Sequence, residues 1–160
     1  MNHKRILFIC DAHLGSGTNE EQKKRILLDF LKGLSPENVS TVYVLGDLFD
    51  FWFEYESVIL SRNFHVLNAL AEVVERGVEI HLIVGNHDFW AGDFMEKTIG
   101  VKVHHDPIEI NLDGRRIYIC HGDGLNSYDH GYLFLKATIR NNTDFRCFIF
   151  FFSFFDLVNM

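Results

Sequence analysis

The stretch Thr41–Asp50, TVYVLGDLFD, constrains the fold more than any other part of the chain. Its apolar, β-branched run, Val42–Leu45, indicates a buried strand that stops at Gly46 and is followed by the carboxylate of Asp47. In α/β sheets ligands bind at the carboxyl ends of the strands, so this order places a charge where a ligand would lie. A Gly-Asp pair also ends strands without any further role, so the motif by itself leaves a turn and a binding site equally open.

Three more predicted strands end in side chains of the same kind. Arg5–Cys10 leads into DAH, Glu79–Val84 leads into GNHD, and a hairpin leads into HGD. Residues two apart in extended chain face the same side, so Asp11 and His13 are expected to point at one object. Each cluster has a structural alternative, such as a turn or a helix N-cap at Asp50. Four clusters in strand order predict one shared site.

Helices are expected between the strands. The spacing of apolar residues predicts amphipathic helices over Glu20–Lys32 and Ser57–Arg76, ended by Gly33 and Gly77, and a short helical segment around Phe94–Thr98. This alternation of strands and helices predicts the α/β class.

Composition and charge narrow the classes of function. The 160 residues suit one domain, and a net charge of −7 argues against a nucleic-acid partner, because phosphate neutralisation needs clustered Lys and Arg. The three cysteines are odd in number and far apart, which favours a reduced, cytoplasmic protein with Cys10 and Cys120 as small core residues. The apolar run near the N-terminus is too short for a signal peptide.

The residue types at the strand ends point to metal chemistry. Carboxylates, imidazoles and an amide oxygen suit Mn, Fe or Zn better than a thiolate site would. Two ions ~3.5–4 Å apart, bridged by a carboxylate, can clamp the attacking and leaving oxygens of a phosphoryl displacement. The glycines before Asp47 and Asn86, and after His121, let the backbone turn tightly beside such ions.

As a set, DxH, GDxxD, GNH[DE] and a later His-Gly pair resemble the calcineurin-like metallophosphoesterases over Arg5–Asp123. The resemblance implies a two-sheet β-sandwich flanked by helices, with two divalent ions bound at one end. Mn²⁺ is the expected metal, with Fe or Zn as alternatives.

The same resemblance implies roles for individual residues. Five are expected to be metal ligands: Asp11, His13, Asp47, Asn86 and His121. Asp11 and His13 would hold one ion, Asn86 and His121 the other, and Asp47 would bridge both. The catalytic residues would be Asp47, Asn86 and His87, with His87 beside the scissile phosphate as an acid or charge stabiliser.

A narrower resemblance, to the UDP-2,3-diacylglucosamine diphosphatases of lipid A synthesis, rests on GDLFDFWFE and on HGDGL followed by DHGY. It implies hydrolysis of UDP-2,3-diacylglucosamine to UMP and an acylated sugar phosphate, with Asn86, His87 and Asp129 contacting the substrate. The best-known branch has GNRDF where this chain has GNHDF; an Arg would pair bidentately with a phosphate, whereas His87 can donate a proton. Two alternatives therefore stay open: a phosphoesterase for a nucleotide or phosphoprotein, and a catalytically incompetent remnant.

The C-terminal part departs from the family. The family has a Gly-His-x-His motif on a later strand, but no histidine follows His130, so we expect a C-terminally incomplete sandwich. A partial catalytic domain over 1–140 and a hydrophobic tail over 141–160 are expected. The Phe-rich run Phe145–Val158 is either the beginning of a truncated lid or an interfacial anchor, and is shorter than the ~20 residues of a membrane-spanning helix. An anchor would place the protein peripherally on the cytoplasmic face of the inner membrane.

Overall fold

A computed structural model describes residues 4–55, 58–125, 128, 130, 131, 133, 134 and 136. Asp129 and the segment 141–160 lie outside the described residues, together with the expectations placed on them. The chain divides into two compact units, Met1–His121 and Gly122–Met160, and every helix and strand named below belongs to the first. The division expected at residue 140 stays a prediction.

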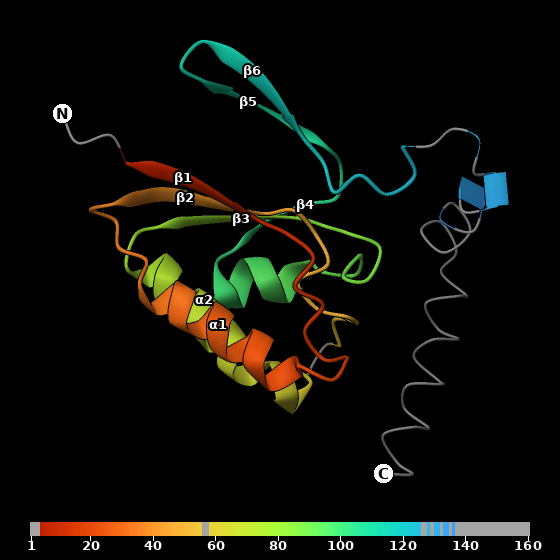
Figure 1. The fold of residues 1–160 in the computed structure, drawn as a ribbon, viewed down its shortest axis with the longest axis horizontal. Coiled ribbons are helices and arrows are strands. Elements are labelled where there is room, and N and C mark those ends of the chain that lie inside the picture. The colour runs from red at the N-terminus through yellow and green to blue at the C-terminus, as the bar shows by residue number, and fades with distance from the viewer. Residues whose placement is uncertain are drawn as a thin grey trace. The chain divides into compact units, whose positions relative to one another are not determined.

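A parallel sheet forms the centre of the first unit (Figure 1). Its strands follow one another in the order β1 (Arg5–Ile9), β2 (Val39–Val44), β3 (Glu79–Ile83) and β4 (Lys102–His104). Because neighbouring strands all run in the same direction, their carboxyl ends meet at one edge of the sheet. The predicted strand-end clusters of β1, β2 and β3 are therefore brought to that edge by topology alone.

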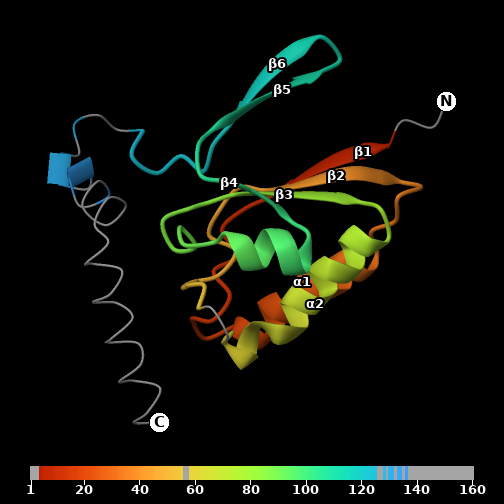
Figure 2. The same cartoon turned by 180° about the vertical axis from the view of Figure 1, so that it is seen from behind.

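Two helices cover one face of this sheet in both views: α1 (Glu20–Lys32) and α2 (Phe64–Glu75) (Figures 1 and 2). The bounds of α1 are those predicted from its apolar spacing. The helix buries Leu27 and Leu31 and ends where the N–H of Gly33 bonds to the carbonyl oxygen of Asp29.

The second helix begins later than predicted. Residues 58–60 are not helical, Ser61–Asn63 form a single 3-10 turn (η1), and the α-helix starts at Phe64. Val58 is 55% exposed, whereas Ile59 packs against the core without being part of the helix. The apolar pattern continued across the turn, which is why the sequence predicted too long a helix.

A hairpin of β5 (Ile108–Leu112) and β6 (Arg115–Ile119) lies on the other face of the sheet (Figures 1 and 2). Its turn residues Asp113 and Gly114 both have positive φ, as a two-residue hairpin turn of type I′ requires. Buried contacts among Tyr43, Ile83 and Ile119 join the two sheets. The predicted α/β arrangement of two sheets with helices is confirmed.

Three smaller features complete the described part. A short π-helix, η2 (Met95–Ile99), forms where a helical segment was predicted. Cys10 and Cys120 are free thiols, and Cys10 is exposed just after β1, so the prediction that it is a core residue is wrong. Among the helices that the structure describes, none is long and apolar enough to cross a membrane.

Candidate metal centre

Acidic and imidazole side chains meet at the carboxyl edge of the parallel sheet. They form two groups in which all potential ligand atoms lie within 4.8 Å of one another: Asp11, Asp47 and His121 in one, and His13, Asp50 and His87 in the other. Four of the five predicted ligands belong to these groups. The fifth, Asn86, is exposed on the same loop as His87, and its role as a ligand stays a prediction.

Asp47 lies between two imidazoles. It is 3% exposed, and its Oδ1 accepts a hydrogen bond of 3.0 Å from the backbone N–H of His87. Its Oδ2 lies 3.6 Å from Nε2 of His13 and 3.4 Å from Nε2 of His121. These separations are long for direct hydrogen bonds, but they suit ligands that share an ion about 2.0–2.2 Å from each. The carboxylate and imidazole donors around Asp47 therefore fit a divalent ion.

The backbone at three of these residues is left-handed. Asp11, His13 and Asp47 have φ of 52°, 44° and 52°, a region that non-glycine residues occupy at a cost of about 1–3 kcal/mol each. The N–H of His13 bonds to the carbonyl oxygen of Asp47 at 2.9 Å and helps to hold this conformation. Asp11 and His13 thus converge, with 3.8 Å between Oδ1 and Nε2, but the expected extended backbone is wrong.

Two glycines leave space for the ligands. A Cβ atom on Gly46 would lie 2.6 Å from Nδ1 of His121, and one on Gly85 would overlap Oδ1 of Asp47. Gly46 also has a positive φ of 83°, as a tight turn requires, whereas φ of Gly85 is not positive. The expected tight turn therefore applies to Gly46 and to Gly122, whose φ is 106°, while Gly85 is needed for close approach.

Backbone carbonyls fix the orientation of two imidazole rings. Nδ1 of His121 lies 2.7 Å from the carbonyl oxygen of Leu45, and Nδ1 of His87 lies 2.6 Å from that of Asp50. Because a carbonyl only accepts, each Nδ1 carries the hydrogen. Nε2 of His121 is left as a lone pair directed at Asp47, the arrangement in which ligating histidines are usually held.

Asp50 is missing from the predicted site residues, although it belongs to the GDLFD cluster, where a helix N-cap was its structural alternative. Its Oδ1 lies 3.6 Å from Nδ1 of His13 and 3.8 Å from Nδ1 of His87. The rings of these two histidines meet edge to face, with 4.8 Å between their centres. No described helix begins at Asp50. The spacing of Asp47 and Asp50, three residues apart in GDLFD, is the sequence feature that could have identified Asp50 as a site residue.

Asp88 holds together the two loops that carry Asp47 and His87. It is fully buried, and its carboxylate accepts the N–H of Leu48 at 2.8 Å and that of Gly85 at 2.7 Å. Burial raises the pKa of the Asp88 carboxyl, against the opposing effect of these backbone N–H groups. Asp88 therefore joins the loop after β2 to the loop after β3.

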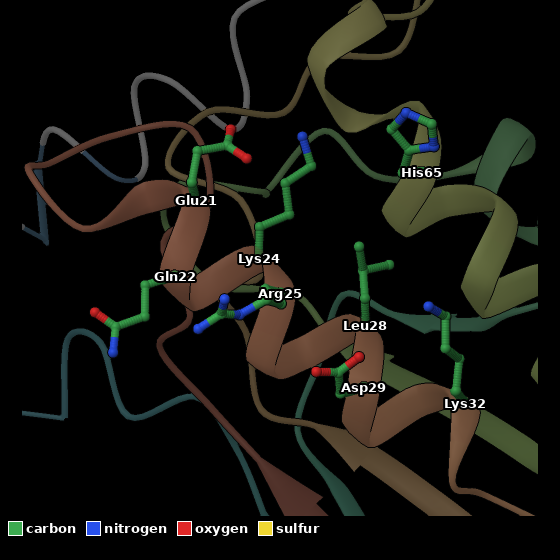
Figure 3. A pocket seen from close by; sticks show the side chains of 8 residues that line it. All are labelled: Glu21, Gln22, Lys24, Arg25, Leu28, Asp29, Lys32 and His65. Carbon is green, nitrogen blue, oxygen red and sulfur yellow. The ribbon is translucent and has the colours of Figure 1, made fainter.

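A separate surface pocket of about 740 Å³ runs along α1 (Figure 3). It is lined by Glu21, Gln22, Lys24, Arg25, Leu28, Asp29, Lys32 and His65. Its charges are mixed in sign, and none of the candidate ligands lines it.

Several known proteins are similar to this chain. The sequence profile described as calcineurin-like phosphoesterase matches residues 4–153. The UDP-2,3-diacylglucosamine hydrolase of Porphyromonas gingivalis is 38% identical over 121 residues, covering 74% of this chain and 46% of the relative. The protein of the same name from Nitrosococcus oceani is 32% identical over 142 residues, covering 89% of this chain and 55% of the relative.

The chain spans about half the length of these curated relatives. Among solved structures, a protein of unknown function from Aquifex aeolicus gives a TM-score of 0.49 at 20% identity, over 84% of this chain and 70% of that chain.

Proposed function

This chain belongs to the calcineurin-like phosphoesterase family, and we propose that it is a metal-dependent hydrolase of UDP-2,3-diacylglucosamine. The reaction would cleave the pyrophosphate at the α-phosphorus and release UMP and the acylated sugar phosphate. The observation that carries the proposal is the buried carboxylate of Asp47 between His13 and His121. The choice of substrate rests on the names of the relatives.

The proposed ligands are Asp11, His13, Asp47, Asn86 and His121, and Mn²⁺ is the proposed metal. Divalent ions held there would polarise the phosphoryl oxygens and activate the attacking water. Fe and Zn suit the same oxygen and nitrogen donors.

His87 is the proposed proton donor to the leaving oxygen. Its Nδ1 is engaged by the carbonyl oxygen of Asp50, and the Asp50 carboxylate lies 3.8 Å from the same nitrogen. Because Nδ1 is engaged in this way, Nε2 is the nitrogen that would face a substrate. A donor of this kind acts mainly in the transition state.

Aromatic side chains beside the site are proposed to hold the uracil or the acyl chains. The ring of Trp90 lies 6.4 Å from that of Phe51 and 5.5 Å from that of Phe53, on the loops that carry His87 and Asp50. Trp52, which lies between Phe51 and Phe53 in the chain, is 2% exposed and stacks on Phe49 in the core, so it is not available to a ligand. Because such a substrate carries acyl chains, we propose that the protein acts peripherally at the cytoplasmic face of the membrane.

The test is turnover of UDP-2,3-diacylglucosamine by the full chain loaded with Mn²⁺, followed as UMP release. We expect UMP from the wild-type chain, and we expect His87→Ala to lower kcat more than it changes KM. Cleavage of simple nucleotide diesters without cleavage of the lipid substrate would overturn the substrate assignment. Mn²⁺ binding without turnover of either substrate would mean a remnant that binds metal but does not catalyse.

A further inference from the structure

Glu54 fastens together the two loops that carry Asp50 and His87. We propose that Glu54 is a positioning residue that sets the orientation of the His87 ring, an inference that rests on the proposed role of His87 as proton donor. Glu54 does not touch the reacting groups. It acts through the backbone of the segment between itself and Asp50.

The carboxylate of Glu54 accepts four hydrogen bonds. Its Oε1 accepts from the backbone N–H of Gly92 at 2.6 Å, from that of Met95 at 3.2 Å and from the indole N–H of Trp52 at 3.4 Å. Its Oε2 accepts from the N–H of Phe94 at 2.9 Å. These backbone groups lie at the start of η2, where helical N–H groups lack partners within the helix and favour a negative charge. One half-buried carboxylate thus holds the 50s loop onto the 90s loop.

A short series of contacts leads from Glu54 to His87. The backbone N–H of Trp52 donates to the carbonyl oxygen of His87 at 3.0 Å, and Phe53 pairs with Trp90 in an isolated parallel bridge. Nδ1 of His87 bonds to the carbonyl oxygen of Asp50. His87 is therefore held by segment 50–52 at both its backbone and its ring, and Glu54 anchors the far end of that segment.

The chemistry of the carboxylate matters as well as its shape. A Gln at this position would keep the length of the side chain, but it would turn an NH₂ group towards backbone donors that need an acceptor. At least one N–H at the start of η2 would lose its partner, and the anchored end of the segment would loosen. A displacement of this segment would move the His87 ring, and the rate of proton transfer depends strongly on the position of the donor.

The first experiment is a double-mutant cycle on the full chain with Mn²⁺ and bis(4-nitrophenyl) phosphate. We expect Glu54→Gln to lower kcat about tenfold, as loss of a supporting group does, and to leave KM within about twofold. In a His87→Ala background the same change is expected to cost nothing further, because its effect passes through His87. Asp93→Asn is the matched control, since this neighbouring carboxylate only pairs with Lys97 at the surface.

The second experiment does not depend on turnover. In ¹H–¹³C spectra of the histidine rings, the His87 signal is identified by its loss in His87→Ala. We expect this signal to shift or broaden in Glu54→Gln and to stay unchanged in Asp93→Asn. Glu54→Asp, which keeps the negative charge and shortens the side chain, should give a smaller change in the same direction and serves if Glu54→Gln does not fold.

An unchanged His87 signal, or an equal loss of kcat with and without His87, would overturn the proposal. If the wild-type chain cleaves no phosphoester, the proposed function fails, and the spectra alone decide whether Glu54 positions the His87 ring.

Discussion

Gly85 lies against the carboxylate of Asp47 so closely that a Cβ atom there would overlap Oδ1 and lie 2.8 Å from the Asp47 backbone nitrogen. Asp47 is buried, and the same Oδ1 accepts the N–H of His87. The carboxylate therefore cannot move aside without breaking a bond between the two ligand loops. The absence of a side chain at Gly85 is what allows these loops to pack together.

Gly85→Ala is therefore expected to destabilise the fold by about 1–3 kcal/mol, the usual effect of overpacking, and to weaken Mn²⁺ binding. Unfolding in urea and a Mn²⁺ titration measure the two effects. Gly33→Ala is the control, because Gly33 has right-handed φ and an added Cβ there would meet nothing closer than 3.4 Å. Equal stability of the two variants would contradict this account of Gly85.

Asp50→Asn is expected to lower kcat about 10- to 100-fold, the usual effect of removing a supporting group, with little change in the unfolding midpoint. The reason is that the carboxylate lies beside both His13 and His87. Phosphodiester hydrolysis with Mn²⁺ measures the effect, and Asp29→Asn on the exposed side of α1 is the control. Activity equal to that of the control would show that Asp50 is only part of a loop.

A pair of histidines on β3 and β4 predicts how stability depends on pH. Nδ1 of His81 lies 2.9 Å from Nε2 of His104, with the rings parallel within 2°. Nε2 of His81 lies 3.4 Å from Glu79, which only accepts when ionised, so His104 donates to His81. Protonation of Nδ1 of His81 would place an N–H donor opposite the N–H of His104 and would break this hydrogen bond.

Burial is the main reason that the pKa values of His81 and His104 are lowered from their ordinary 6.5. The folded state then favours the neutral rings, so their contribution to stability is complete above pH 6.5 and is lost as the pH falls through the lowered values. We expect the thermal midpoint to fall on acidification below about pH 6.5. His104→Gln should reduce this slope and the exposed His65→Gln should not; equal slopes in both would contradict the prediction.

Much of the site could be predicted because parallel strands bring their carboxyl ends together. The polar clusters that follow successive predicted strands were enough to place Asp11, His13 and His87 near Asp47. The left-handed backbone at Asp11 and His13 could not be predicted, because it depends on bonds to a neighbouring loop such as that from His13 to Asp47.

Other features depended on contacts between segments that are distant in sequence. Glu54 bonds to backbone about 40 residues away, a partnership that no local pattern records. Trp52 and Phe53 are adjacent in an aromatic run, yet Trp52 is buried and Phe53 is only half-buried. Whether Trp52 or Phe53 points into the core depends on how their segment pairs with the loop around Trp90.

The most direct test of the central claim is a calorimetric titration of Mn²⁺ into the wild-type chain and into Asp47→Ala. If Asp47 bridges two ions, the wild-type chain binds two Mn²⁺ and the variant loses most of this binding, because its two neighbouring imidazoles no longer share a carboxylate. Unchanged stoichiometry and affinity in Asp47→Ala would contradict the bridging role and the metal centre built around it.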